Sequence, residues 1–342
     1  MKRVAINGFG RIGRNFLRAY LERRPDYEIV AVNDLGDPPT VAHLLRFDSL
    51  LGPLRQPVAV GSETITVGDL NLRALSIPEP ANLPWRELEI DVVVEATGHF
   101  AERVKAQAHL DAGSRAVVIS AIAKDADVTL VLGVNDGAYN PDRHFIVSNA
   151  SCTTNCVTPM AKVLHDAFGI ERGFMTTVHA YTAGQPVLDM PHKDLRRARA
   201  AAINLIPTTT GATRALGTVM PELEGKIGAM AIRAPIPVGS LVDLVVELSE
   251  TVGRGEVNAA FREAAETAPL SGIIRYADEP LVSSDIIRSP YSCVFDSQLT
   301  MSEGELVKVF GWYDNEWGYS CRLVDLVARI GAAPCRAKRC VP

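Results

Sequence analysis

The sequence predicts an α/β fold in which a wound parallel sheet is followed by an α+β part with a mostly antiparallel sheet. Three observations lead to this prediction. Short apolar strands alternate with helical stretches in the N-terminal part, which is typical of a parallel sheet covered on both faces. After residue 168, longer runs of alternating apolar and polar residues replace this pattern and favour antiparallel strands. The length of 342 residues favours two domains.

Composition and charge argue against several classes of protein. The net charge of −5 argues against a general nucleic-acid or membrane-surface binder. Six cysteines are too few for a disulfide scaffold, and no His or Cys pair stands at ligand spacing from Cys152 and Cys156, so we expect no metal site. No apolar run reaches the roughly 18 residues that span a membrane, and no secretory leader precedes the first strand. We therefore expect a cytoplasmic protein with reduced thiols.

The first 35 residues are the most informative segment. A strand at 3–7 leads into Gly8-Phe9-Gly10-Arg11-Ile12-Gly13, a helical stripe follows, and a second strand at 28–32 ends just before Asp34. This Gly-x-Gly-x-x-Gly pattern between a strand and a helix is typical of a Rossmann-type dinucleotide-binding domain. The glycines allow a tight turn and the approach of a pyrophosphate to the helix N-terminus. A carboxylate at Asp34 would accept hydrogen bonds from ribose hydroxyls and repel a 2′-phosphate, which favours NAD over NADP.

The remaining elements follow in order along the chain. Strands at 91–95, 116–119 and 129–132, with a helix near 101–112, continue the parallel sheet, and the proline-rich segment 52–90 is expected to leave it. The second sheet is expected to contain the runs 173–179, 227–235, 239–249 and 305–313. Between its strands, the basic stretch 182–203 is long enough to indicate a functional loop. A final helix is expected at 322–331, and the tail 333–342 is expected to be disordered.

Cys152 has surroundings that favour a reactive thiol. It lies in Ser148-Asn149-Ala150-Ser151-Cys152-Thr153-Thr154-Asn155-Cys156, directly before an apolar stripe at helical spacing. A thiol at a helix N-terminus faces free N–H groups, which favour the thiolate. Pro159 predicts that the helix kinks there or begins close by. For an isolated cysteine, a buried structural role would be the more common alternative.

Five motifs together resemble one enzyme family. The segments 7–14, 148–156, 179–182 (His-Ala-Tyr-Thr), 209–212 (Thr-Thr-Gly-Ala) and 312–319 (Trp-Tyr-Asp-Asn-Glu-Trp-Gly-Tyr) resemble phosphorylating glyceraldehyde-3-phosphate dehydrogenase. The resemblance runs in order from residue 2 to about residue 331. It implies a Rossmann-type NAD-binding domain over 1–151 that is completed by a C-terminal helix at 316–332. It further implies a catalytic domain over 152–315 and a homotetramer.

The resemblance implies oxidation and phosphorylation of D-glyceraldehyde 3-phosphate to 1,3-bisphosphoglycerate with NAD, a reaction of glycolysis. Cys152 would add to the aldehyde, the hemithioacetal would give a hydride to NAD, and inorganic phosphate would attack the resulting thioester. His179, which follows the predicted strand, would be the base beside the thiol.

The resemblance also implies the binding residues. The substrate phosphate would be held by Thr182 and Arg233, and the inorganic phosphate by Ser151, Thr153, Arg197, Thr210 and Gly211. The hydroxyl-rich run 208–211 supports an anion site independently of the family. Besides Gly8, Gly10, Gly13 and Asp34, the residues implied at the cofactor are Arg11, Ile12, Leu35, Thr97, Phe100, Ser120, Pro191 and Asn315. Among these, Asn315 would contact the nicotinamide carboxamide, and Leu35 and Pro191 accompany a preference for NAD.

The sequence departs from the family pattern at four places. Gly184 stands where an Asp is usual, Ile122 where a Pro is usual, Val238-Gly239 where Asn-Val is common, and Leu51 where a His is customary. One hypothesis is a duplicate of the glycolytic enzyme that tolerates electrophiles directed at the thiol. Erythrose-4-phosphate dehydrogenase is the alternative enzyme, and the motif 209–212 argues against it. A binding protein without catalysis is a third alternative, and the presence of Cys152 and His179 argues against that.

Overall fold

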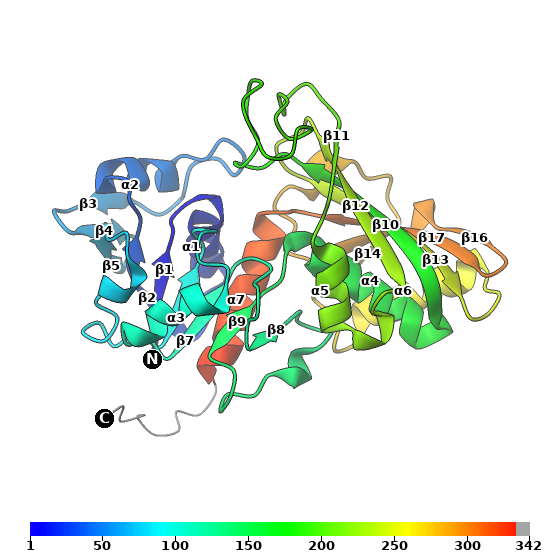
Figure 1. Ribbon diagram of the computed structural model, residues 1–342, viewed down its shortest axis with the longest axis horizontal. Helices are drawn as coiled ribbons and strands as arrows, with labels where there is room; N and C mark the ends of the chain where they lie inside the picture. Colours follow the sequence, from blue (N-terminus) through cyan, green and yellow to red (C-terminus); the bar gives the residue numbers. More distant parts are fainter. Residues whose placement is uncertain (333–342) are drawn as a thin grey trace. The chain divides into compact units, whose positions relative to one another are not determined.

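The computed structural model describes residues 1–332, which form two compact units (Figure 1). The first unit contains residues 1–130, 137–149 and the described residues from 320 on, and the second contains 131–136 and 150–319. The sequence-based division placed 1–151 and 316–332 in the first domain, so residues 131–136, 150–151 and 316–319 differ from it. The tail expected at 333–342 lies outside the described residues.

The first unit is built on a nine-stranded sheet in the order β3-β4-β5-β2-β1-β6-β7-β9-β8. Its central strands are parallel and completely buried, as expected for a sheet covered on both faces. The parallel strands are β1 (Lys2–Asn7), β2 (Tyr27–Asn33), β5 (Leu70–Leu75), β6 (Val92–Glu95), β7 (Ala116–Ile119), β8 (Val128–Thr129) and β9 (Ile146–Ser148). The helices of this unit are α1 (Arg11–Arg23), α2 (Pro38–Arg46), α3 (Arg103–Asp111) and the part of α7 (Trp317–Ala332) from Ser320 on.

Two predictions for this unit are wrong. Residues 52–90 do not leave the sheet, because β3 (Val58–Val60), β4 (Thr64–Val67) and β5 (Leu70–Leu75) extend its edge (Figure 1). The prolines of the segment fall outside these strands, and β5 pairs in parallel with β2. The strand predicted at 129–132 ends at Thr129, since the Val131 amide donates to the Asn135 side chain in a turn.

The second unit is built on a mostly antiparallel sheet, as predicted. Its order is β11-β12-β10-β13-β17-β15-β14, with β16 beside β17, and the pairs β10–β12 and β14–β15 are parallel. The strands are β10 (Ile170–Ala180), β11 (Ile206–Thr208), β12 (Ile227–Ala234), β13 (Ser240–Leu248), β14 (Ile274–Ala277), β15 (Cys293–Asp296), β16 (Met301–Glu303) and β17 (Leu306–Tyr313). The helices are α4 (Cys152–Phe168), α5 (Ala212–Val219) and α6 (Arg254–Glu266), and α7 (Trp317–Ala332) begins in this unit.

Helix α4 covers one face of this sheet and contacts β10, β13, β15 and β17. Met175, Thr177 and His179 are buried at alternate positions of β10, whereas Phe174 on the opposite face is 77% exposed. The helix begins at Cys152 and continues through Pro159, so of the two predicted alternatives, a kink at Pro159 or a start close by, the start is excluded. Pro159 cannot donate to the Asn155 carbonyl, and Thr158 Oγ1 donates to the neighbouring Thr154 carbonyl at 2.8 Å.

The basic stretch expected at 182–203 connects β10 to β11 without a helix or strand and extends from the sheet near β11 (Figure 1). Residues 1–332 also contain five short 3-10 helices: η1 (Pro80–Asn82), η2 (Asp136–Ala138), η3 (Pro221–Leu223), η4 (Ser283–Ile286) and η5 (Ser297–Leu299). Among residues 1–332, no helix combines the length and apolar character that crossing a membrane requires.

The contact between α6 and the second sheet gives a first prediction. Phe261 and Phe295 are fully buried and stack with ring centroids 3.8 Å apart. Phe261→Ala should lower the free energy of unfolding by about 3–5 kcal/mol, because it removes buried apolar surface and leaves a cavity. Urea unfolding measures this change. Val104→Ala, at an exposed position of α3, is the control and should change the free energy by less than about 0.5 kcal/mol.

Candidate active site

Cys152 is the first residue of α4. Hydrogen bonds to the two preceding residues, Ala150 and Ser151, hold the backbone that leads into the helix. Ser151 caps the helix, with its Oγ accepting a hydrogen bond from the Thr154 amide at 3.0 Å. Ala150 has φ of 54°, a left-handed conformation that is unfavourable for residues with a Cβ. Its carbonyl accepts a hydrogen bond from Tyr319 Oη at 3.0 Å. A strained residue held in this way is typical of functional sites.

His179 lies beside the thiol. Its Nε2 is 3.4 Å from Cys152 Sγ, so a proton can pass between the two side chains. His179 stands near the end of β10 and faces Arg233 of β12 in the parallel register. The rigid sheet thus places a base next to the first residue of α4.

Arg233 and the Ala180 carbonyl compete for Nδ1 of His179, and this competition affects which ring nitrogen carries the proton. Arg233 Nη1 and the Ala180 carbonyl oxygen each lie 2.6 Å from His179 Nδ1. Arginine only donates, so a hydrogen bond from Arg233 requires a bare Nδ1, whereas the bond to Ala180 requires a protonated one. The two bonds exclude each other. Only the tautomer with Nδ1 donating to Ala180 leaves Nε2 able to accept the proton of Cys152.

The surroundings favour the neutral forms of this pair. Cys152 keeps some exposed surface, but burial raises the pKa of its thiol to about 11, and the charge of Arg233 offsets only part of this effect. Burial, followed by the charge of Arg233, lowers the pKa of His179 to about 3. The sequence predicted that the helix N-terminus favours a thiolate at Cys152, and burial of the thiol acts in the opposite direction.

Tyr313 is a buried member of the site to which the sequence analysis gave no role. Its hydroxyl lies 2.9 Å from Thr153 Oγ1 and 2.8 Å from Thr177 Oγ1, and its ring stands edge-on to His179. These contacts join the first turn of α4 to β10 and β17. An inward-facing tyrosine in the predicted strand 305–313, just before Asn315, was the available indication.

Asn315 is connected to the same centre through Ser240, which sequence reasoning also missed. The Ala180 amide donates to Ser240 Oγ at 3.1 Å, and Ser240 Oγ donates to Asn315 Oδ1 at 3.1 Å. The side-chain oxygen of Asn315 is therefore occupied by a donor, and its amide group is oriented.

The predicted anion-binding residues belong to the second unit. Arg197 Nε donates to Thr208 Oγ1 at 2.9 Å, and this hydroxyl donates to Asp194 at 2.8 Å. The charge of Arg197 lowers the pKa of both His179 and Arg233, after the larger effect of burial on each, so the three groups lie within electrostatic range. The other predicted anion-binding residues lie at the ends of elements of this unit: Ser151 and Thr153 at the start of α4, Thr210 and Gly211 just before α5, and Thr182 after β10.

The glycine loop of the first unit has the shape expected for a dinucleotide. Gly8 has φ of 90°, and a Cβ there would lie 2.5 Å from the Thr97 amide nitrogen. A Cβ at Gly13 would lie 2.1 Å from the Gly8 carbonyl oxygen, whereas a Cβ at Gly10 would meet nothing within 4 Å. The loop is thus closed against its own backbone at Gly8 and Gly13 and open at Gly10, before a helix without a side-chain cap. This geometry fits a pyrophosphate.

Asp34 lies next to this loop. Its carboxylate accepts hydrogen bonds from the Phe9 amide at 2.7 Å and from the Gly36 amide at 2.9 Å. Arg11 forms an ion pair with Asp48, and Leu35 is largely exposed. The other predicted cofactor residues of this unit are Ile12 in α1, Thr97 and Phe100 after β6, and Ser120 after β7. Pro191 and Asn315 belong to the second unit.

One of the four departures, Gly239, has a local explanation. Gly184 has open space where a Cβ would lie, so nothing in the fold requires glycine there. Gly239 has φ of 87°, and a Cβ would come within 2.3 Å of the Ser283 carbonyl oxygen, so this chain needs glycine. Nothing in the structure explains Ile122 or Leu51.

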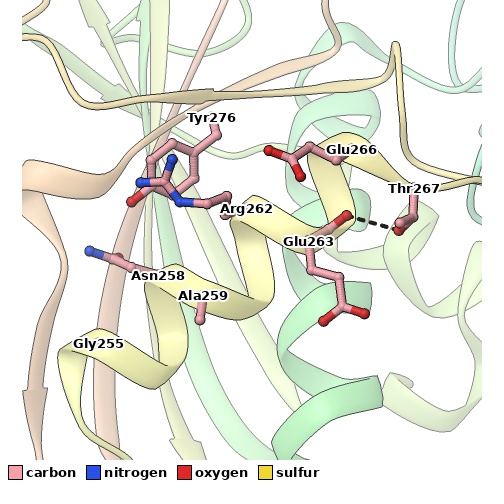
Figure 2. A pocket seen from close by; sticks show the side chains of 8 residues that line it. All are labelled: Gly255, Asn258, Ala259, Arg262, Glu263, Glu266, Thr267 and Tyr276. Carbon is pink, nitrogen blue, oxygen red and sulfur yellow. Dashed lines mark hydrogen bonds between the residues drawn. The ribbon is translucent and has the colours of Figure 1, made fainter.

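A separate surface pocket lies along α6 (Figure 2). Arg262 covers the ring of Tyr276 at 4.1 Å, and Asn258 donates to the Ser297 carbonyl. None of its eight lining residues is a cysteine or a histidine, so it lacks the chemistry of the Cys152 centre. Within residues 1–332 the four cysteines are free, and no cluster of three or more potential ligands could hold a metal ion.

Comparison with known proteins identifies a family match for each of the two regions described above, the glycine loop and the Cys152 centre. Residues 2–103 match the family described as "Glyceraldehyde 3-phosphate dehydrogenase, NAD binding domain", and residues 151–315 match "Glyceraldehyde 3-phosphate dehydrogenase, C-terminal domain". The chain is 58% identical over 330 residues to the glyceraldehyde-3-phosphate dehydrogenase of Streptomyces coelicolor, covering 96% of this chain and 98% of that one. It is 56% identical over 336 residues to the enzyme of that name from Mycolicibacterium smegmatis, with coverage of 96% and 98%.

These relatives do not favour the alternative of erythrose-4-phosphate dehydrogenase. The NAD-binding domain confirms the predicted cofactor. The chain belongs to the glyceraldehyde-3-phosphate dehydrogenase family, which comprises NAD-dependent oxidoreductases that act on an aldehyde group.

Proposed function

We propose that this chain converts D-glyceraldehyde 3-phosphate and inorganic phosphate to 1,3-bisphosphoglycerate, with Cys152 as the nucleophile and His179 as the base. The distance of 3.4 Å between Cys152 Sγ and His179 Nε2, at the start of a helix, is the observation that carries this proposal. Covalent attachment of the aldehyde divides one difficult reaction into two easier steps.

The steps follow from the positions of these two side chains. Cys152 Sγ attacks the aldehyde carbon while its proton passes to His179 Nε2 and on to the carbonyl oxygen, giving a hemithioacetal. Bound NAD would supply the acceptor for the hydride that leaves that carbon. His179 Nε2 takes the hydroxyl proton as the thioester forms. Phosphate then attacks the thioester carbon, the carbon–sulfur bond breaks, and the sulfur of Cys152 regains a proton from His179.

Arg233 links substrate binding to the state of the base in this proposal. A substrate phosphate held by Arg233 and Thr182 would draw the guanidinium towards the anion and reduce the positive charge beside His179. Nδ1 could then donate to the Ala180 carbonyl, and Nε2 would be the acceptor. The base would thus be prepared when the substrate is bound.

The second anion would be inorganic phosphate. Arg197, with Thr210, Gly211 and the residues Ser151 and Thr153 beside Cys152, would supply charge, hydroxyl groups and helix N-terminal amides. The hydrogen bond from Arg197 to Thr208, backed by Asp194, holds the guanidinium in a defined position.

The proposed cofactor contacts follow the residues that the family resemblance implies. Gly8, Gly10, Gly13, Arg11 and Ile12 would surround the pyrophosphate, and Asp34 would bind the adenosine ribose. Asn315 would donate its amide to the nicotinamide carboxamide, because its oxygen already accepts from Ser240. Leu35, Thr97, Phe100, Ser120 and Pro191 complete the proposed contacts.

We also propose a homotetramer. The connection between β10 and β11 exposes several apolar side chains, among them Val187 at 79%, Leu195 at 82% and Ile203 at 79%. The open face of the second sheet exposes Phe174 at 77% and Met230 at 41%. Exposed apolar side chains at these two places support association with further copies of the chain. The cytoplasmic location and the tolerance of electrophiles remain predictions.

The overall reaction gives a second prediction. NADH formation from D-glyceraldehyde 3-phosphate should require inorganic phosphate, because the thioester needs an acceptor. Erythrose 4-phosphate, tested in parallel, should be the poorer substrate. Turnover independent of phosphate that prefers the tetrose would contradict the proposed function.

The base gives a third prediction. His179→Asn should lower kcat by roughly 10²- to 10⁴-fold, because proton transfer to and from the hemithioacetal is lost. Steady-state assays at saturating substrates measure this change. His43→Asn, in α2 of the first unit, is the control and should keep the kcat of the unaltered chain. An equal kcat for both variants would remove His179 from the mechanism.

The two arginines give a fourth prediction, since each should affect a different anion. Loss of a charge-assisted hydrogen bond corresponds to roughly a 10- to 100-fold weaker interaction. Arg233→Ala should raise the KM for the triose phosphate by that factor, and Arg197→Ala should raise the KM for inorganic phosphate. Arg199→Ala is the matched control, because Arg199 pairs with Asp189 at an exposed position. If Arg233→Ala and Arg197→Ala raised both constants equally, the separate assignments would be wrong.

A further inference from the structure

A buried polar network adjoins the glycine loop of the first unit. Glu95, at the end of β6, is 2% exposed and accepts hydrogen bonds from Asn7 Nδ2 at 2.6 Å, the Thr97 amide at 2.8 Å and Thr97 Oγ1. Its fourth donor is His109 Nε2 of α3, at 3.0 Å. His109 is completely buried. None of the proposed reaction steps uses Glu95 or His109.

Trp85 determines which nitrogen of His109 carries the proton. The indole Nε1 lies 3.0 Å from His109 Nδ1, and an indole can only donate. His109 Nδ1 therefore accepts, and the proton of the neutral ring is on Nε2, where it is donated to Glu95. A protonated Nδ1 would face the indole N–H, so the surroundings hold the neutral ring in one tautomer.

The network reaches both sides of the glycine loop. Asn7 directly precedes Gly8, and its Oδ1 accepts a hydrogen bond from Asn33, the residue before Asp34, at 2.7 Å. Thr97 forms the other side, because the face of Gly8 lies against the Thr97 backbone. Through these bonds Glu95 fixes Asn7 and Thr97 relative to each other, and so fixes the space next to Gly8.

Stability alone does not account for this arrangement. Within residues 1–332, no Lys or Arg forms an ion pair with Glu95, and its partner His109 is neutral in the tautomer described above. Removing a carboxylate from water is costly, and apolar residues of similar volume usually serve stability as well or better. A network with every bond directed instead favours a preorganised surface for a ligand.

We propose that His109 is a positioning residue for NAD: held in one tautomer by Trp85, it fixes Glu95, and Glu95 fixes Thr97 and Asn7 for the adenosine half of the cofactor. This inference rests on the proposed placement of the cofactor at Gly8 and Thr97. Without the His109 donor, Glu95 and Thr97 would lose their fixed geometry, and binding would have to order them.

Two substitutions of His109 test the proposal. His109→Leu should weaken NAD and ADP-ribose binding equally, each by about tenfold in calorimetric titration, because a hydrogen bond to a charged group is lost. Both kcat at saturating NAD and the KM for the triose phosphate should stay as in the unaltered chain. His109→Gln can donate to Glu95 and accept from Trp85, so it should bind both ligands within about threefold of the unaltered chain.

The controls separate positioning from loss of stability. Val117→Ala truncates the buried core of the same unit without touching the network, and it should leave the affinity for NAD unchanged. If His109→Leu does not fold, Trp85→Phe replaces it, because it removes the indole donor and should weaken NAD binding about threefold. Unchanged binding by the His109→Leu or Trp85→Phe variant, no rescue by Gln, or an equal loss in Val117→Ala would overturn the proposal. Failure of the proposed function would show separately, as missing triose turnover in the unaltered chain.

Discussion

The parallel pairing of β10 with β12 is the constraint on which the chemistry of the second unit depends. It sets His179 opposite Arg233, and the same strand turns Met175, Thr177 and His179 towards α4. A shift of one residue would turn His179 to the opposite face, away from Cys152. The bulky Phe174 lies over Gly228 of β12, where a Cβ would come within 2.9 Å of its ring, so this register is specified on both faces of the sheet.

Both units position reactive or binding groups with backbone at the ends of helices and strands. In the second unit, Cys152 begins a capped helix and His179 stands near the end of a strand. In the first, the glycine loop joins the end of β1 to the start of α1, and buried hydrogen bonds extend from Asn7 through Glu95 to His109. In each unit, buried polar groups form hydrogen bonds to the residues that are expected to contact a ligand. These groups limit the movement of the site before any ligand arrives.

The sequence predicted the parts of this molecule that depend on local pattern. The glycine loop, the strand containing His179 and the helix after Ser151 each have a short-range signature, and the fold class followed from the alternation of strands and helices and from the later alternating runs. The edge strands β3 to β5 were missed because prolines surround them and their pairing with β2 is a long-range contact. Tyr313, Ser240 and the network around Glu95 were missed for the same reason, since their partners lie far away in the chain. The effect of burial on Cys152 also depends on packing that no local pattern contains.

The left-handed backbone at Ala150 also bears on how this site can change during evolution. Glycine or asparagine could adopt the same φ at little cost, whereas a β-branched side chain would push the chain out of the turn that leads into α4. The position therefore admits few residue types although its side chain performs no chemistry. A constant residue at this position would therefore reflect the backbone conformation that the turn requires. A substitution there would move the nucleophile without altering any group that reacts.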